Sequence, residues 1–305
     1  MSRKTVLVTG ATGLQGGSVA RHLLRSGKYN VRCLSRNTTS GKARALRQAG
    51  GELVAGDLGD RASLKAAMRG CDVVFGVTNF WEHFEGERQH GANLVDAVAE
   101  AKVPRFVFST LPSAKNITGG KIAVPHLDIK AEIEQYARQR GLNAVYVNVA
   151  FYYENFINFQ MLQRQPDGTL AFGFPQGDTP LAALSVEDLG GVVVPLLERF
   201  DEVAGKVVGV VGEDAPCSHY AEVMTRVLGR KAAYQYIPRD VYAKFAFPGA
   251  EELADMFEFN RLHIPNRKAD LEQCRKLYPA MQDFETWLNS NRAMFEPLLR
   301  SAAAS

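Results

Sequence analysis

A run of glycines near the start of the chain constrains its fold more than any other stretch. Residues 5–9 are apolar and β-branched and predict a buried strand, and Gly10, Gly13 and Gly16 follow with the spacing G-x-x-G-x-x-G. Glycines at these places allow a tight turn, a close approach of backbone to a pyrophosphate, and close packing of the next helix on the strand. The helical pattern that follows would direct its first N–H groups, and the positive end of its dipole, at the phosphates. This order of strand, turn and helix predicts a dinucleotide site.

The residues after the second expected strand, 30–35, bear on which dinucleotide binds. In this kind of site an acidic side chain there takes the adenosine ribose hydroxyls, whereas an arginine accommodates a 2′-phosphate. Here the position is occupied by Arg36, and no carboxylate occurs between residues 36 and 44. A guanidinium can hold a phosphate through two N–H groups. The sequence therefore favours NADP(H) over NAD, while the alternative that Arg36 merely caps a surface loop stays open.

The composition excludes several functions. The chain has 305 residues, of which 46% are hydrophobic and 23% charged, and its net charge of +3 is too balanced to predict a nucleic-acid or membrane surface. Its four cysteines are scattered without a C-x-x-C pair, which indicates reduced thiols and neither a disulfide frame nor a metal site. Neither a signal peptide nor an apolar run of membrane length is recognisable. We therefore expect a cytoplasmic protein without a metal site.

Strand and helix patterns alternate over the first 150 residues. Further strands are expected at 52–55, 71–77, 105–110 and 143–148, with helices between them, which predicts an α/β fold with a doubly wound, parallel Rossmann sheet. Residues 206–211 predict a late strand of the same sheet. We expect an NADP-binding domain over residues 1–155, to which segments from about 180 to 212 return. Residues 156–179 and 213–305 are expected to form a smaller α/β lobe for a substrate or partner, with one final helix at 284–299.

Several polar and aromatic residues follow the expected strands, where the ligand crevice of such a sheet lies. Asp57 could accept the adenine amino group or simply begin a turn. The run Trp81, His83 and Phe84 could cover the nicotinamide or form a surface contact, and the aromatic residues after the sixth strand could be part lid and part core. The cofactor-binding residues predicted on these grounds are Gly10, Thr12, Gly13, Leu14, Gln15, Gly16, Arg36, Asp57, Leu58, Thr78, Asn79, Phe80, Tyr152, Tyr153 and Asn155.

Four features occur together: Val8-Thr9-Gly10-Ala11-Thr12-Gly13 with Gly16, then Arg36, then Gly56-Asp57, and a later His-x-x-x-Lys. In combination they resemble the NmrA-like family, an atypical branch of the short-chain dehydrogenase/reductase superfamily. The resemblance runs from residue 1 to about residue 300. It implies a Rossmann domain that binds NADP(H), a small C-terminal lobe, and often dimers. Some members of the family sense the NADPH/NADP⁺ balance and report it to transcriptional regulators, and others are reductases.

One departure from the wider superfamily concerns catalysis. Its reductases carry Tyr-x-x-x-Lys, with the phenol as proton donor and the lysine lowering the phenol pKa and holding the nicotinamide ribose. Here the spacing is kept, but the first residue is His126 and only Lys130 matches. Ser109 stands where the superfamily has a serine that polarises the substrate carbonyl. The resemblance thus implies Lys130 as a cofactor-binding residue and His126, Lys130 and Ser109 as candidate catalytic residues.

Two interpretations of His126 remain. An imidazole that titrates near neutral pH is a competent general acid, or it is only a polar wall of a binding site. The missing tyrosine favours weak or absent catalysis, and hence a redox sensor that meets a regulatory protein. The alternative is an NADPH-dependent oxidoreductase acting on a quinone or small carbonyl ligand. The sequence has no helix-turn-helix pattern, so direct binding of nucleic acid is not expected, and homodimerisation is left open.

Overall fold

Contacts between residues divide the chain into two compact units. The computed structural model describes residues 3–300. The first unit contains the chain up to Ile117 together with Pro125–Val149 and Glu187–Val210, and the second contains Thr118–Val124, Ala150–Val186 and the chain from Val211 onward. Whether these units are a nucleotide-binding domain and a substrate or partner lobe remains a prediction.

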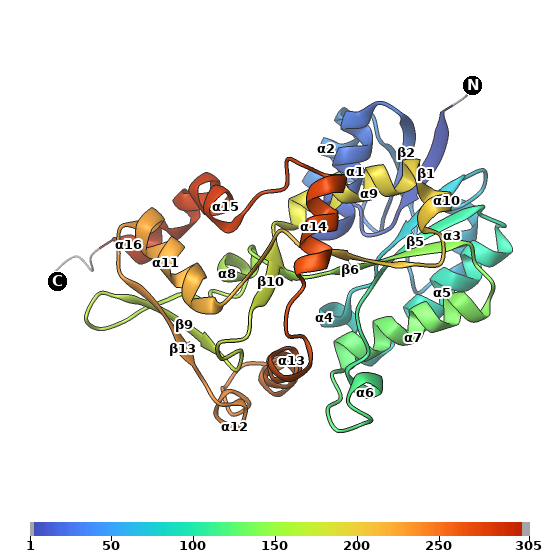
Figure 1. Cartoon of the computed structure of the whole chain (residues 1–305). Helices are drawn as coiled ribbons and strands as arrows, with labels where there is room; N and C mark the ends of the chain where they lie inside the picture. The colour runs from blue at the N-terminus through green and yellow to red at the C-terminus, as the bar shows by residue number, and fades with distance from the viewer. Residues whose placement is uncertain (1–2, 301–305) are drawn as a thin grey trace. The chain divides into compact units, whose positions relative to one another are not determined.

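A parallel sheet of seven strands forms the centre of the first unit (Figure 1). Its order is β11-β6-β5-β4-β1-β2-β3, and every neighbouring pair is parallel. The strands are β1 (Lys4–Val8), β2 (Tyr29–Ser35), β3 (Glu52–Ala55), β4 (Val73–Gly76), β5 (Arg105–Thr110), β6 (Ala144–Val149) and β11 (Val207–Val210). The order reverses between β1 and β4, which makes the carboxyl end of this pair the switch point where such sheets bind ligands. The Rossmann prediction is confirmed.

Helices cover both faces of this sheet. Successive residues of a strand point to opposite faces, so a strand in which every residue is apolar must be covered on both. Leu7 packs in one apolar cluster with Leu94 and Ile129 from the helices of one face, while its neighbours Val6 and Val8 are equally buried. On the face of Leu7, α3 packs against α5 and α5 against α7, and on the other face α1 packs against α9. The helical segments are α1 (Leu14–Ser26), α2 (Gly41–Gln48), α3 (Arg61–Ala67), α4 (Phe80–His83), the 3₁₀ segment η1 (Phe84–Gly86), α5 (Glu87–Glu100), α6 (Ala114–Ile117), α7 (Pro125–Gln139), α9 (Leu189–Glu198) and α10 (Phe200–Val203).

The second unit is built on two small sheets and an aromatic core. One sheet has the order β12-β10-β7 and the other β13-β9-β8. The rings of Phe174 and Phe257 are stacked 4.2 Å apart at the centre of the core, and Phe284 and Trp287 pack in the same cluster. The strands are β7 (Phe151–Tyr152), β8 (Gln163–Arg164), β9 (Leu170–Phe174), β10 (Leu181–Leu184), β12 (Glu213–Ala215) and β13 (Ala232–Tyr236), and the helices are α8 (Asn155–Asn158), α11 (Cys217–Leu228), α12 (Arg239–Tyr242), α13 (Ala250–His263) and α14 (Lys268–Leu277).

The final helix expected at residues 284–299 is wrong in its continuity. The chain forms three segments there, α15 (Phe284–Asn291), the 3₁₀ segment η3 (Arg292–Phe295) and α16 (Glu296–Leu299). Pro297 accounts for the break, because proline has no N–H to donate and its ring clashes with the carbonyl four residues earlier. At the first turn of α16 neither defect matters, since those N–H groups have no intrahelical acceptor.

Candidate functional site

The predicted glycine turn joins β1 to α1 as the sequence indicated. Gly10 has a φ of 56°, and the N–H of Gly13 donates to the carbonyl of Gly10 at 2.8 Å. Gly16 lies in the first turn of α1, where a Cβ would come within 2.3 Å of the Thr9 carbonyl oxygen and 2.4 Å of that of Gly10. Contacts this short involve backbone and cannot relax by a side-chain movement. The fold therefore excludes a side chain at Gly16, which keeps the start of α1 against the strand end.

The N-terminus of α1 opens directly from this turn, beside Thr12, Leu14 and Gln15. Gly13 is its N-cap. Because glycine has no side chain, this position offers no side-chain acceptor to the first N–H groups of the helix. By contrast, Asp60 caps α3 by accepting from the N–H groups of Ala62 and Ser63. The first N–H groups of a helix need an acceptor, and an anion placed there is also favoured by the helix dipole. This arrangement fits the diphosphate of a dinucleotide.

Arg36 follows β2, as predicted, and its partner is a carboxylate. Its Nη2 lies 2.6 Å from Oε1 of Glu82, and the two side chains are 55% and 40% exposed. The other carboxylate oxygen of Glu82 accepts from the amide of Asn79 at 3.2 Å. The Arg36 guanidinium holds the pKa of the Glu82 carboxyl below its usual value. The pair is therefore ionised at neutral pH, and a 2′-phosphate would meet Arg36 already paired with an anion.

Asp57 and Leu58 follow β3 in the first unit. The Oδ1 of Asp57 accepts from the N–H of Gly59 at 2.7 Å, so the carboxylate organises the turn in which it stands. The carbonyl of Leu58 accepts from the amide of Asn93 at 2.9 Å. This hydrogen bond supports the interpretation that Asp57 begins a turn, and its contact with adenine stays a prediction.

Lys130, on α7, lies in a buried polar cluster at the end of β4. Its Nζ donates to Oε1 of Glu87 at 2.5 Å and to the carbonyl and hydroxyl oxygens of Thr78, both at 3.0 Å. Glu87 has no exposed surface, and Lys130 and Thr78 are 8% and 5% exposed. An ammonium has three N–H donors, and three acceptors surround this one. The contact of Lys130 with a nicotinamide ribose stays a prediction that would require one of these bonds to be replaced.

His126 lies one helical turn before Lys130 and packs against α4. Its ring centroid is 5.3 Å from that of Trp81 and 5.9 Å from that of Phe80. The imidazole is 7% exposed, whereas Trp81 is 39% exposed. Ser109 is buried at the carboxyl end of β5, with 1% of its surface exposed. The first unit therefore brings His126, Lys130, Thr78 and Phe80 to one end of its sheet.

The remaining predicted residues belong to the second unit. Tyr152 ends β7 and is half-buried, and Asn155 begins α8. Tyr153 is fully buried, its ring 5.1 Å from that of Phe284, and its hydroxyl donates to Glu213 at 3.5 Å. These contacts support the interpretation that Tyr153 belongs to the core of the second unit. A role for Tyr152, Tyr153 and Asn155 in holding a cofactor stays a prediction.

Two carboxylates were missed by sequence reasoning, Glu82 and Glu87. Acidic residues in the first turn of a helix are favoured by the helix dipole and are ordinarily solvated, so nothing in the sequence marked Glu87 as buried. A signal for Glu82 was present in principle, because it follows Trp81 in the loop after β4. No sequence pattern, however, indicates that a residue of that segment pairs with the loop after β2.

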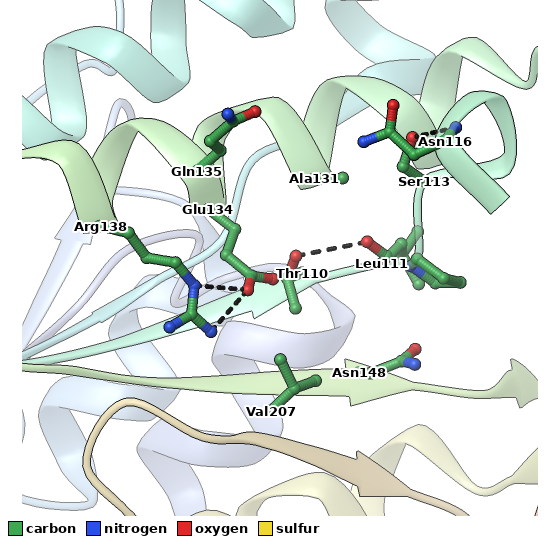
Figure 2. A pocket seen from close by; sticks show the side chains of 11 residues that line it. Thr110, Leu111, Ser113, Asn116, Ala131, Glu134, Gln135, Arg138, Asn148 and Val207 are labelled. Carbon is green, nitrogen blue, oxygen red and sulfur yellow. Dashed lines mark hydrogen bonds and ion pairs between the residues drawn. The ribbon is translucent and has the colours of Figure 1, made fainter. Parts of the chain in front are cut away.

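A polar pocket of about 430 Å³ also lies in the first unit, between α7 and the ends of β5, β6 and β11 (Figure 2). In it Glu134 and Arg138 point toward each other, and Arg138 is bonded to Glu134 at 2.7 Å and to the carbonyl of Gly205 at 2.8 Å. The guanidinium is thus neutralised within the protein. The lining residues are Thr110, Leu111, Pro112, Ser113, Asn116, Ala131, Glu134, Gln135, Arg138, Asn148 and Val207, and the pocket is separate from the predicted cofactor residues.

Other classes of site find no support between residues 3 and 300. Over that range no three His, Cys, Asp or Glu side chains are grouped so as to hold a metal ion. The helices there are each too short or too polar to traverse a bilayer.

Comparison with known proteins identifies the family. The model of the NmrA-like family matches residues 2–288. The chain belongs to this family. An NmrA-like family domain-containing protein of Dictyostelium discoideum is 31% identical over 253 residues, which cover 80% of this chain and 83% of that protein. An NmrA-like family domain-containing oxidoreductase of Penicillium ochrochloron is 30% identical over 300 residues, 90% of each chain.

The NmrA-like assignment also agrees with the architecture. NmrA, described as a negative transcriptional regulator and solved in complex with NADP, superposes with a TM-score of 0.84, at 22% identity, over 97% of this chain and 98% of its own. At this level of identity the likeness supports the fold alone. The sequence relatives and the solved structure thus agree on an NmrA-like α/β protein, and they carry different functional descriptions.

Proposed function

We propose that this NmrA-like protein binds NADP(H) through its first unit. The observation that carries the proposal is Gly16, where backbone atoms leave no room for a Cβ and α1 starts against the end of β1. Such a turn lets a diphosphate reach the first N–H groups of the helix. Arg36 is the group that would bind the 2′-phosphate. The NADP complex of NmrA is consistent with this proposal.

The bound cofactor serves, in this proposal, as a signal and not mainly as a reagent. Two observations support weak or absent dehydrogenase activity. His126 replaces the phenol that the wider superfamily uses as proton donor, and its ring is packed against Trp81 and Phe80. The Nζ of Lys130 is paired with the Glu87 carboxylate, whose negative charge offsets the effect that the ammonium would have on the pKa of a neighbouring acid. We infer a redox sensor that meets a regulatory protein partner.

Calorimetric titration with NADP, NADPH and NAD tests the cofactor assignment. Binding of NADP with micromolar affinity, weaker binding of NAD, and loss of that preference in Arg36→Ala would support it. Arg44→Ala is the matched control, because Arg44 is another basic residue after β2 whose Nη1 donates to the Thr39 carbonyl. If NADP and NADPH both fail to bind at millimolar concentration, the cofactor assignment is wrong.

A second function, NADPH-dependent reduction of a quinone or small carbonyl compound, is favoured by one observation. The relative from Penicillium ochrochloron, which matches this chain over 90% of its own length, is named an oxidoreductase. In this function NADPH supplies the hydride, and His126 holds a proton for the substrate oxygen. Oxidation of NADPH followed at 340 nm against quinones and aldehydes decides between the two. Turnover that His126→Ala abolishes would support the enzyme, and absence of turnover with NADPH bound supports the sensor.

We propose that the predicted lobe for the substrate or partner, residues 156–179 and 213–305, is part of the second unit, which also includes Thr118–Val124 and Ala150–Val186. The four free cysteines are consistent with a reducing, cytoplasmic compartment, and the small net charge with a protein that contacts a ligand or a protein and does not itself bind nucleic acid. Size-exclusion chromatography with light scattering, with and without NADP, tests whether it forms a homodimer.

A further inference from the structure

Glu82 is joined to two parts of the first unit at once. Through its carboxylate it contacts Arg36, with 2.6 Å between Nη2 and Oε1, and Asn79. Through the backbone of α4 it is the direct neighbour of Trp81, whose ring lies 5.3 Å from that of His126. The same short helix therefore connects the residue proposed to read the adenosine phosphate with the residue that replaces the catalytic tyrosine.

Only part of α4 is held firmly in the core. Phe80 is 4% exposed and packs in the apolar cluster of the first unit, whereas Trp81 is 39% exposed. The helix ends at Phe84, which has a φ of 47° although it carries a side chain and is 52% exposed. A residue with a side chain at such a φ is strained unless its surroundings enforce it, and such positions are frequent at switching segments. The ion pair with Arg36 is one restraint on this part of the chain, beside the ring contacts of Trp81 with His126 and of Phe84 with Phe80.

We infer that Glu82 is a specificity-determining residue for the 2′-phosphate: it occupies Arg36 in the free protein, is displaced by the phosphate of NADP(H), and on displacement releases α4 beside His126. This inference rests on the proposed cofactor site. It adds that NADP and NAD, which differ by one phosphate, leave α4 in different states. Glu82 then distinguishes NADP from NAD, and the position of Trp81 changes with the outcome.

The strengths of the competing interactions make the exchange feasible. Both partners of the Arg36–Glu82 pair are about half exposed, and ion pairs of this kind contribute little to stability. A phosphate near neutral pH carries a charge of about −1.5 to −2 and three acceptor oxygens, so it competes well with a single carboxylate for a guanidinium. NAD has hydroxyls there and leaves the pair in place. Glu82 also repels the incoming phosphate until it moves, which lowers the affinity for NADP.

Affinity measurements with nucleotide fragments test the competition. The probes are 2′,5′-ADP, which carries the decisive phosphate, and 5′-AMP, which lacks it. Glu82→Gln should raise the affinity for 2′,5′-ADP by roughly three- to fivefold, the range that a half-exposed ion pair allows, and leave that for 5′-AMP unchanged. The gain should vanish in an Arg36→Ala background. Glu85→Gln is the matched control, because Glu85 is an exposed carboxylate of the same segment that pairs with Arg88.

Tryptophan fluorescence tests the release of α4. The chain has two tryptophans, so Trp287→Phe leaves Trp81 as the only reporter. The emission of Trp81 should change with 2′,5′-ADP and not with 5′-AMP, and neither probe contains a nicotinamide ring that could quench it. In Glu82→Gln the emission should already resemble that of the 2′,5′-ADP complex. Should Trp287→Phe fold poorly, the difference between native protein and Trp81→Phe isolates the same signal.

The outcomes separate this inference from the function on which it rests. If NADP and both fragments fail to bind, the cofactor site is wrong and the inference falls with it. If NADP binds but Glu82→Gln behaves like Glu85→Gln, the cofactor site stands and Glu82 has no part in specificity. If affinity changes as expected but Trp81 responds equally to both fragments, Glu82 competes for Arg36 without releasing α4, which overturns the coupling.

Discussion

The Nζ of Lys130 lies 2.5 Å from Oε1 of Glu87, and this ion pair is shut away from solvent, with no part of Glu87 exposed. It ties the middle of α7 to the first residue of α5, and through Thr78 to the end of β4. The second oxygen of Glu87 has no hydrogen-bond partner among the described residues. A lysine held in this way joins α7 to α5 and to the end of β4, whatever else it contacts when a ligand is bound.

Lys130→Met should destabilise the protein strongly. It leaves the Glu87 carboxylate buried without a counter-ion, and breaking a buried pair from one side costs about 3–5 kcal/mol. Lys130→Met combined with Glu87→Leu should recover much of the loss, because both charges are then gone. Urea denaturation of the native protein and of these variants gives their free energies of unfolding. Lys28→Met is the control, since Lys28 pairs with Glu198 in an exposed position and its loss should have little effect on the free energy of unfolding. Equal losses for Lys130→Met and Lys28→Met would contradict this account.

Gly16→Ala should damage both folding and cofactor binding. The added methyl would meet the Thr9 and Gly10 carbonyl oxygens at 2.3 and 2.4 Å, so either α1 or the turn must move, at a cost of about 3 kcal/mol or more. Gly41→Ala is the matched control, because Gly41 also lies in the first turn of a helix but has no atom within 4 Å of an added Cβ. It should leave stability unchanged or raise it by up to about 1 kcal/mol. Thermal unfolding and NADP titration of the two variants measure the difference, and similar behaviour would show that the turn tolerates side chains.

The glycine turn could be predicted from sequence because its cause is local. Strand, turn and helix are adjacent in the chain, and the steric demand at Gly16 comes from residues six and seven positions earlier. The Lys130–Glu87 pair could not be predicted in this way, because its partners are 43 residues apart and either alone is typical of a solvated helix surface. Which lysine becomes buried depends on how α5 and α7 pack, and a single sequence does not state that packing.

The second difference between prediction and structure has a local cause. The broken helix after Phe284 follows from Pro297, which the sequence displays plainly. The aromatic run at Tyr152 and Tyr153 is a different case. Tyr152 is half-buried and Tyr153 is fully buried, where it contacts Phe284 and Trp287 from a distant part of the chain. Contacts of such separation decide whether an aromatic residue belongs to a core, so the alternatives left open at that point could not be resolved from the sequence.

Acidification should weaken the fold in part through His22. Burial lowers the pKa of His22 below its ordinary value of 6.5, opposed by a hydrogen bond to the Ser18 carbonyl. As pH falls below about 6.5, the unfolded chain binds a proton that the folded imidazole resists, so stability falls, whereas above it both states are neutral and His22 contributes nothing. The charges facing it are Arg21, Arg25 and Glu187. Burial opposes the shift at Glu187, but its ion pairs hold that carboxyl pKa below its usual value, so Glu187 stays ionised over this range.

The measurement for His22 is the free energy of unfolding between pH 7.5 and 5.5. His22→Gln cannot titrate, so its stability should depend less steeply on pH than that of the native protein. His90, whose pKa is also lowered mainly by burial, leaves a residual slope in that variant. His263→Gln is the control, because it removes an imidazole that lies on an exposed part of α13. Parallel pH profiles for native protein and His22→Gln would rule out this role.

The four cysteines should be unreactive in the folded protein, which bears on the proposed role as a redox sensor. All four are free and buried, and burial raises the pKa of Cys33 to about 12 and that of Cys274 to about 11. Since the thiolate is the reactive form, Ellman's reagent at pH 8 should label none of them within minutes, and all four after denaturation in guanidinium. Rapid labelling of Cys71, the most exposed of them at 7%, would show that the chain around α3 opens. Absence of labelling would exclude thiol oxidation as the means by which the proposed sensor detects redox state.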